Sequence, residues 1–258
     1  MYRRWTRCCD VYRKGKIKMV KIALVTGGTR GIGASISASL KTSGHTVIAN
    51  YASNDESAEN FSNETGIEVM KWDVSNYEET TSCISEIYKK HSSIDILVNN
   101  AGITQDAPLH KMTIEKWNKV ISVNLNSVFN VTSSVINKMR ENGFGRIINI
   151  SSVNGQKGQF GQTNYAATKS ALIGFSKSLA LESASKGITS NVICPGYINT
   201  EMVAAIREDI LKSIIDTIPA KRLGEAKEIA EMVSYLVSEN GSYINGATFS
   251  VNGGLWMD

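Results

Sequence analysis

The sequence has few of the residues that build disulfide frameworks and metal sites. Four of its 258 residues are cysteine, and no two of them form a C-x-x-C pair. The three histidines, His45, His91 and His110, are scattered along the chain. This usage argues against a disulfide framework and a metal site, and it is typical of a reducing compartment. We therefore expect no metal and a cytoplasmic protein.

Long apolar runs and an excess of one charge are missing from most of the chain. No run approaches the roughly 18–20 apolar residues of a membrane span, so we expect no membrane partner. The net charge of +4 arises in residues 1–18, because the remainder holds 21 basic and 23 acidic residues. A near-neutral body gives no case for nucleic-acid binding. The basic head is a binding arm, a transit peptide or a disordered extension; we expect a disordered extension, with the domain at 19–258.

What is present, from residue 20 onward, is a regular alternation of strand-like and helical segments. It predicts one α/β domain with a parallel sheet and helices on both faces. The expected strands are 22–26, 46–50, 68–72, 94–99, 146–151, 190–194 and 248–251. The expected helices are 32–42, 56–64, 77–90, 114–141, 165–185 and 225–238. The irregular segment 196–222, with amphipathic pieces at 201–207 and 209–216, follows a strand and is well positioned to cover a site.

A tyrosine and a lysine stand four residues apart at the start of an expected helix. Residues at i and i+4 share one helix face, so Tyr165 and Lys169 can share one site. A phenol titrates near pH ~10, and a neighbouring cation lowers its pKa toward the range of a general acid–base catalyst. The spacing therefore predicts a proton-transfer pair. Taken alone, it is equally typical of a packed tyrosine beside a solvated lysine.

The first expected strand runs into a glycine-rich turn, T-G-G-T-R-G-I-G, and then a helix. Glycines at such a turn let the backbone approach a pyrophosphate, whose charge the helix N-terminus stabilises. The spacing differs from the usual G-x-G-x-x-G, and a plain tight turn is the alternative. The expected cofactor contacts here are Gly27, Arg30, Gly31, Ile32 and Gly33.

The end of the second strand indicates which dinucleotide is bound. NAD-binding sites have an acidic residue near this position, whereas here Asn50 is neutral and the next carboxylate is Asp55. Arg30 can bind a 2′-phosphate through two hydrogen bonds, with neutral hydrogen bonds from Asn50 and Ser53. We therefore expect NADPH. A merely solvated Arg30 is the alternative.

The third and fourth strands end in further candidate contacts. Asp73 can accept from an adenine amino group, with Val74 beside the ring; alternatively, Asp73 caps the following helix. The small residues after the fourth strand permit close backbone approach, and their amides can bond neighbouring strands and the cofactor. These residues are Asn100, Ala101 and Gly102.

Five motifs occur in order: T-G-x-x-x-G-I-G, N-N-A-G, a serine thirteen residues before the tyrosine, Y-x-x-x-K and P-G. Together they resemble the short-chain dehydrogenase/reductase family, over residues 20–258. The resemblance implies a single Rossmann-type three-layer domain with a seven-stranded parallel sheet. It also implies a homotetramer formed through helices 114–141 and 165–185, and cofactor contacts from Pro195, Gly196 and Ile198.

The resemblance also assigns catalytic roles. Ser152 matches the serine that binds the substrate carbonyl, Tyr165 the general acid, and Lys169 the residue that binds ribose and lowers the tyrosine pKa. Asn124 matches an asparagine that holds a proton-relaying water, although a solvated or packing asparagine is the alternative. Hydride attack places negative charge on the carbonyl oxygen, which two aimed donors stabilise. Ser151 is the rival of Ser152; alternation points the two apart, and the family spacing selects Ser152.

The segment 152–165 is very similar to that of bacterial acetoacetyl-CoA reductases of polyhydroxybutyrate synthesis, as are 102–106, 195–198 and 206–211 with 218–224. This implies NADPH-dependent reduction of acetoacetyl-CoA, a small molecule, to (R)-3-hydroxybutyryl-CoA. Amides would bind the thioester oxygen between apolar walls, unless the segment is only a polar surface loop. The pocket residues implied are Asp106, Gln159, Phe160, Gln162 and Tyr197.

Other activities stay open at this point. A 3-oxoacyl-(acyl-carrier-protein) reductase needs basic residues for its acidic partner, and Arg140 and Lys186 are the candidates. The CoA-specific relatives carry arginines after the second strand, where this chain has N-D-E. A broad alcohol or sugar dehydrogenase and a non-catalytic dinucleotide sensor are further alternatives, but all four catalytic positions are retained.

Overall fold

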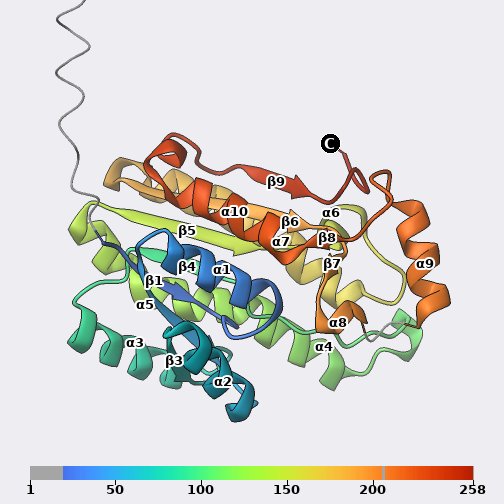
Figure 1. The fold of residues 1–258 in the computed structure, drawn as a ribbon, viewed down its shortest axis with the longest axis horizontal. Coiled ribbons are helices and arrows are strands. Elements are labelled where there is room, and N and C mark those ends of the chain that lie inside the picture. The colour runs from blue at the N-terminus through green and yellow to red at the C-terminus, as the bar shows by residue number, and fades with distance from the viewer. Residues whose placement is uncertain (1–19, 205–206, 258) are drawn as a thin grey trace, which may run out of the picture.

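The computed structural model describes residues 20–204 and 207–257, so the expected extension at 1–18 lies outside the described part. Seven parallel strands form one sheet in the order β3-β2-β1-β4-β5-β6-β9, with helices on both faces (Figure 1). The predicted Rossmann-type α/β architecture is confirmed. The strands are β1 Ile22–Val25, β2 Thr46–Tyr51, β3 Glu68–Lys71, β4 Ile96–Asn99, β5 Gly145–Ile150, β6 Ile188–Pro195 and β9 Thr248–Val251.

The strand order fixes where a ligand can bind. β1 pairs with β2 on one side and with β4 on the other, so connections leave it in opposite directions. Val25 at the end of β1 is in register with both Ala49 and Val98, which brings the carboxyl ends of the three strands together. In open α/β sheets ligands bind in the crevice at such a reversal.

Each face of the sheet has its own apolar core. On one face the strands pack against α1, α2 and α10, and on the other against α3, α5 and α7 (Figure 1). The interior strand β5 is buried along its whole length, as expected for a parallel strand covered on both faces. The helices are α1 Gly31–Thr42, α2 Asp55–Thr65, α3 Tyr77–His91, α4 Ile114–Ile121, α5 Ser127–Asn142, α6 Val153–Lys157, α7 Thr163–Ser183, α8 Glu201–Ala204, α9 Glu208–Thr217 and α10 Ala226–Val237.

Three local features differ from the prediction. The helix expected at 114–141 is interrupted between α4 and α5 by a π-helical turn, η3 Ser122–Asn126. The segment after β5 contains the short helix α6, and a two-stranded sheet pairs β7 Ile198–Asn199 with β8 Gly224–Glu225. Each of these elements contains only two to five residues, which is too few for a recognisable periodic pattern of apolar residues. Single-turn 3-10 helices complete the fold at η2 Leu109–Lys111, η4 Ala184–Lys186 and η5 Glu239–Gly241.

The irregular stretch before α10 follows the prediction more closely. The amphipathic piece expected at 209–216 is α9, and the one expected at 201–207 is represented by the shorter α8. No helix within 20–204 or 207–257 combines the length and the apolar character needed to cross a membrane.

Candidate active site

The glycine turn between β1 and α1 leaves no room for side chains at two positions. A Cβ on Gly33 would lie 2.0 Å from the Gly27 carbonyl oxygen, and one on Gly27 would lie 3.2 Å from Ala101 Cα. Gly31, the first residue of α1, has a φ of +53°, and its nearest neighbour is a Thr200 methyl 3.6 Å from the Cβ position. A tight backbone turn that opens at a helix N-terminus fits the pyrophosphate of a dinucleotide.

The side chains of two asparagines hold this turn in place through hydrogen bonds to backbone groups. Asn50 Oδ1 accepts from Gly27 N at 3.2 Å, and its Nδ2 donates to Trp72 O at 3.0 Å and Tyr51 O at 3.3 Å. Asn100 Nδ2 donates to Thr26 O and Gly27 O, both at 3.0 Å. Both N–H groups of Asn50 are therefore donated within the protein. The hydrogen bond expected from Asn50 to a 2′-phosphate would require one of these bonds to break.

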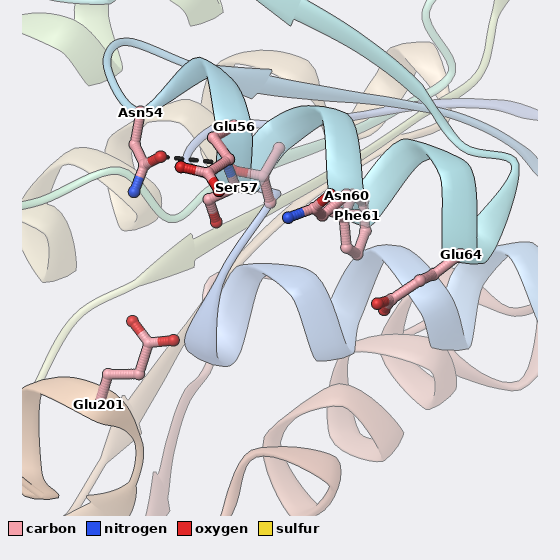
Figure 2. A pocket seen from close by; sticks show the side chains of 8 residues that line it. Asn54, Glu56, Ser57, Asn60, Phe61, Glu64 and Glu201 are labelled. Carbon is pink, nitrogen blue, oxygen red and sulfur yellow. Dashed lines mark hydrogen bonds between the residues drawn. The ribbon is translucent and has the colours of Figure 1, made fainter.

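Arg30 lies beside the turn as the exposed N-cap residue of α1, and no described side chain pairs with its guanidinium. A pocket of about 400 Å³ opens nearby, between the turn, α2 and α8 (Figure 2). Lys71, at the end of β3, is paired with Asp55 at 2.8 Å. Three carboxylates, of Glu56, Glu64 and Glu201, line the pocket beside the turn that carries Arg30. The pocket is lined by Thr29, Asn54, Glu56, Ser57, Asn60, Phe61, Glu64 and Glu201.

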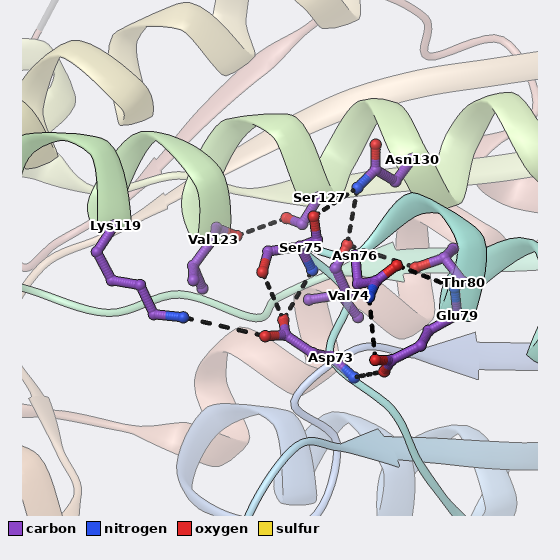
Figure 3. Close-up of polar contacts among 10 residues, drawn as sticks. All are labelled: Asp73, Val74, Ser75, Asn76, Glu79, Thr80, Lys119, Val123, Ser127 and Asn130. Atoms are coloured by element: carbon purple, nitrogen blue, oxygen red, sulfur yellow. Dashed lines mark hydrogen bonds and ion pairs between the residues drawn. The ribbon is translucent and has the colours of Figure 1, made fainter. Parts of the chain in front are cut away.

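At the expected adenine end, Asp73 is held by its own chain. Asp73 Oδ1 accepts from Ser75 N at 2.9 Å and from Ser75 Oγ at 2.7 Å (Figure 3). Burial opposes ionisation, but these bonds and the charge of Lys119 hold the pKa of the Asp73 carboxyl below its usual range. The alternative that Asp73 caps α3 is wrong, because Asn76 is the N-cap and accepts from Glu79 N at 3.1 Å. Val74 is buried beneath this turn.

Ser152 and Tyr165 meet at the carboxyl end of β5. Ser152 is the N-cap of α6, and its Oγ accepts from Asn154 N at 3.1 Å. The side chain of Ser152 lies close enough to the Tyr165 phenol to lower its pKa, against the effect of burial. Ser151 points elsewhere, because its Oγ donates to Lys169 O at 2.7 Å. Between the two rival serines, the one selected by the spacing is therefore the one in contact with the tyrosine.

The pKa of Tyr165 is raised, not lowered. Burial is the main cause and the charge of Asp106 adds to it, while the nearby Ser152 side chain opposes both. Lys169 is itself buried; its Nζ donates to Ile150 O at 2.8 Å and lies 5.7 Å from the centre of the Tyr165 ring. Burial lowers the pKa of Lys169 to about 8. Lys169 is not among the groups that shift the phenol pKa in the ligand-free protein, so the expected net lowering of the Tyr165 pKa is not found.

Asn124 lies in the π-helical turn η3 and is 1% exposed, so the alternative of a solvated asparagine is wrong. Its Oδ1 accepts from Ile103 N at 2.8 Å, and its Nδ2 donates to Ile103 O at 2.9 Å. A Cβ on Gly102 would lie 3.4 Å from Lys169 Nζ and 3.5 Å from Asn124 Oδ1. Asn124 and Lys169 therefore both lie beside Gly102.

The expected acyl-pocket residues separate into two groups. Gln162 Nε2 donates to Asp106 Oδ2 at 2.9 Å, and Asn154 Nδ2 donates to Gln162 Oε1 at 3.0 Å. Asn154 also lies close enough to Tyr197 to lower the pKa of its phenol, so three of the expected residues, Asp106, Gln162 and Tyr197, lie around Asn154. Gln159 accepts from Lys157 Nζ at 2.9 Å, and Phe160 is 86% exposed, so both lie outside this network.

Asn154 is the site residue that the sequence analysis missed. Its only signal in the sequence is a polar residue two places after the serine.

The expected cofactor contacts in the loop after β6 lie next to strand β9. Gly196 N donates to Val251 O at 3.0 Å, Pro195 ends β6, and Ile198 begins β7. Within the described residues, no cluster of His, Cys, Asp and Glu could hold a metal ion.

Comparison with known proteins shows the family. A family model described as "Enoyl-(Acyl carrier protein) reductase" matches residues 27–256. The chain is 56% identical over 240 residues to an acetoacetyl-CoA reductase of Shinella zoogloeoides, covering 93% of this chain and 100% of the relative. The chain belongs to the short-chain dehydrogenase/reductase family. Another acetoacetyl-CoA reductase, of Rhizobium meliloti (strain 1021), is 55% identical with the same coverage. A 3-oxoacyl-(acyl-carrier-protein) reductase of Salmonella typhimurium is 46% identical, covering 92% and 98%.

As a member of this family the protein is an oxidoreductase that uses a nicotinamide cofactor. The close-packed glycine turn and its open helix N-terminus fit such a dinucleotide, with the cofactor supplying the hydride. The protein contributes orientation and two polar hydrogens, from Ser152 and Tyr165, at the carboxyl end of β5. A phenol that keeps its proton is suited to donate it to an oxygen that gains charge.

Proposed function

We propose that this protein reduces acetoacetyl-CoA to (R)-3-hydroxybutyryl-CoA with NADPH. The observation that carries the proposal is the placement of Ser152 next to the buried Tyr165 phenol, beside the hydrogen bond from Gln162 to Asp106. The two relatives that are 55% and 56% identical bear the name acetoacetyl-CoA reductase. Together they support a proton-donating site for a ketone that carries a second carbonyl nearby.

Each catalytic side chain has one role in this proposal. Ser152 and Tyr165 donate to the ketone oxygen as negative charge develops there, and Tyr165 transfers its proton to the alkoxide. Lys169 binds the nicotinamide ribose. Asn124 holds the loop after β4 and the water from which Lys169 regains a proton. Asp106, Gln159, Phe160, Gln162 and Tyr197 surround the acyl group.

Arg30 is the residue we propose to distinguish NADPH from NADH. A guanidinium can bind a phosphate through two charge-assisted hydrogen bonds. The carboxylates of Glu56 and Glu201 near the turn work against a phosphate, so Arg30 has to outweigh them. The remaining proposed cofactor contacts are Gly27, Gly31, Ile32, Gly33, Asn50, Asp73, Val74, Asn100, Ala101, Gly102, Pro195, Gly196 and Ile198.

We further propose a cytoplasmic homotetramer that acts on a small molecule. Exposed apolar side chains on the two long helices support an assembly through them, since Phe129 of α5 is 58% exposed and Leu181 of α7 is 86% exposed. The mass measured by light scattering tests this, and a monomer at micromolar concentration would contradict it.

The activity is tested by parallel kinetics with four substrate pairs. Acetoacetyl-CoA and acetoacetyl-carrier protein are each offered with NADPH and with NADH, and the product is resolved by chiral chromatography. We expect the highest kcat/KM with acetoacetyl-CoA and NADPH, and the (R) alcohol. An (S) product, or no turnover of acetoacetyl-CoA, would overturn the proposal.

A 3-oxoacyl-(acyl-carrier-protein) reductase is the alternative function. Arg140 and Lys186, the basic residues considered for the carrier protein, lie just before β5 and β6. Arg140 NH1 also donates to Glu182 O at 3.0 Å. They therefore lie at the edge of the sheet opposite to Ser152, away from the site of their own protomer. This favours the CoA substrate.

A further inference from the structure

Asn154 is a buried side chain that connects three separate parts of the site. It lies on α6, two residues after Ser152, and is 8% exposed. Its backbone N–H donates to Ser152 Oγ at 3.1 Å, and its Nδ2 donates to Gln162 Oε1 at 3.0 Å. Its remaining amide contact is with Tyr197, in the loop after β6. Nothing in the proposed chemistry uses this residue directly.

The bond from Asn154 decides which way the Gln162 amide is turned. A glutamine amide can be placed with its oxygen and nitrogen exchanged, and its neighbours select one orientation. Asn154 donates to Oε1, so Nε2 faces the Asp106 carboxylate at 2.9 Å. The reverse orientation would place two N–H donors face to face at Asn154, and two oxygens face to face at Asp106. One N–H of Gln162 is left over for an oxygen of the substrate.

The other half of the Asn154 amide acts on Tyr197. Asn154 Oδ1 is buried and has no hydrogen-bond partner among the described residues. The Tyr197 hydroxyl approaches Asn154 closely enough to lower its own phenol pKa, although burial raises that pKa overall. A buried carbonyl oxygen without a full partner costs free energy. Asn154 therefore favours the Tyr197 position in which the hydroxyl is directed at its amide.

We propose that Asn154 is a positioning residue that orients Gln162 and Tyr197 for recognition of the acyl group without touching the reacting atoms. Because Gln162 and Tyr197 bind substrate under the proposed function, the inference rests on that function. The effect of losing Asn154 should therefore appear in substrate affinity. The backbone N–H that contacts Ser152 is retained in any substitution except proline, so the serine stays in place.

The test compares Asn154→Ala with Gln156→Ala as a matched control. Gln156 is an amide on the same helix, but its Nε2 donates to Ser250 Oγ on β9 at 3.0 Å and does not contact the network. For Asn154→Ala we expect KM for acetoacetyl-CoA to rise about 10-fold, as for the loss of one or two hydrogen bonds. In the same variant we expect kcat to stay within about 3-fold, and KM for NADPH within about 2-fold, of the wild-type values. Gln156→Ala should have the same kinetic constants as the wild type.

Two further variants separate positioning from folding. Asn154→Asp keeps the size of the side chain but replaces the donor with a carboxylate oxygen opposite Gln162 Oε1, so we expect a rise in KM at least as large. A buried carboxylate also lowers Tm, so the kinetics are measured well below the Tm of this variant. Asn154→Ala combined with Gln162→Ala should have no larger effect than the stronger single variant, because coupled residues are not additive. Additive effects, a fall in kcat at constant KM, or an equal effect of Gln156→Ala would overturn the proposal.

The outcome is distinguishable from failure of the proposed function. If the wild type does not reduce acetoacetyl-CoA, the same cycle is measured with acetoacetyl-carrier protein or another ketone that it does reduce. A coupled KM effect with that substrate supports the role of Asn154 while the proposed function fails. Independent effects of Asn154 and Gln162 on every ketone reduced would overturn the inference itself.

Discussion

The cofactor end and the substrate end of the site are built in different ways. At the cofactor end, Asn50 and Asn100 bond to backbone groups of the glycine turn, and Gly33 packs against a backbone carbonyl. At the substrate end, Asn154, Gln162 and Asp106 bond to one another through side chains. Most side-chain hydrogen bonds in proteins go to backbone or water, so the substrate end is the unusual one.

The difference predicts how each end responds to substitution. A turn held by backbone contacts depends on glycines in its own segment, and it fails when one of them gains a side chain. A network of side chains from separate segments of the chain can be rearranged by a single substitution while the backbone stays in place. This division allows one scaffold to keep its dinucleotide while its substrate changes.

Tyr165→Phe should have the largest effect on activity, because it removes the proton donor at the point where the cofactor end and the substrate end of the site meet. Removing the proton donor should lower kcat about 1,000-fold, within the range for general acid catalysis. The Kd for NADPH, measured by fluorescence quenching, should stay within about 2-fold of the wild type. Retained turnover would mean that another group donates the proton, and it would leave the sensor and dehydrogenase alternatives to be examined.

Gly33→Ala should weaken binding of the cofactor without disturbing the substrate end of the site. A Cβ at 2.0 Å from the Gly27 carbonyl oxygen forces the turn to move, and overpacking of this kind costs about 1–3 kcal/mol. We expect the Kd for NADPH to rise about 10- to 100-fold. Gly174→Ala is the matched control, since nothing lies within 4 Å of its Cβ position and it should leave the Kd unchanged. Equal Kd values for the two variants would contradict the packing argument.

Arg30→Ala sharpens the comparison within the cofactor end. A charge-assisted hydrogen bond is worth about 1.5–3 kcal/mol, so KM for NADPH should rise about 10- to 100-fold. NADH lacks the 2′-phosphate, and its KM should change less than 2-fold. Steady-state kinetics with both cofactors measures this, and parallel changes would show that Arg30 does not distinguish them.

Deleting residues 1–18 should have the smallest effect. This segment carries seven basic residues and precedes the strand that opens the domain. We expect unchanged kcat, unchanged KM values and the same mass by light scattering, because every residue proposed for the site lies after residue 18 in the sequence. An insoluble or inactive truncated protein would show that the segment is structural.

Features that depend on residues close together in the chain could be predicted from the sequence. The seven strands and the glycine turn follow from apolar runs and glycine spacing, and Ser152 and Tyr165 from their separation. The turn η3 was missed because one extra residue within a helix leaves the apolar pattern almost intact. The Asn154 network joins residues 8 and 56 positions apart in its two bonds, so no local pattern encodes it.

The phenol pKa is the expectation that failed for a physical reason. Sequence spacing places a cation one helical turn from Tyr165, which argues for a lowered pKa. The packed structure adds burial and the charge of Asp106, and these outweigh the opposing interactions. Burial also lowers the pKa of Lys169 to about 8, so its own charge is lost as the pH rises above that value.

The central claim is that Tyr165 stays protonated until negative charge develops on the ketone oxygen of the substrate, and that it then donates its proton to this oxygen. Titration of tyrosinate absorbance in the ligand-free protein, taken as the difference between wild type and Tyr165→Phe, measures this directly. The account predicts that Tyr165 ionises only at a higher pH than a free phenol. Ionisation of Tyr165 near neutral pH would contradict it.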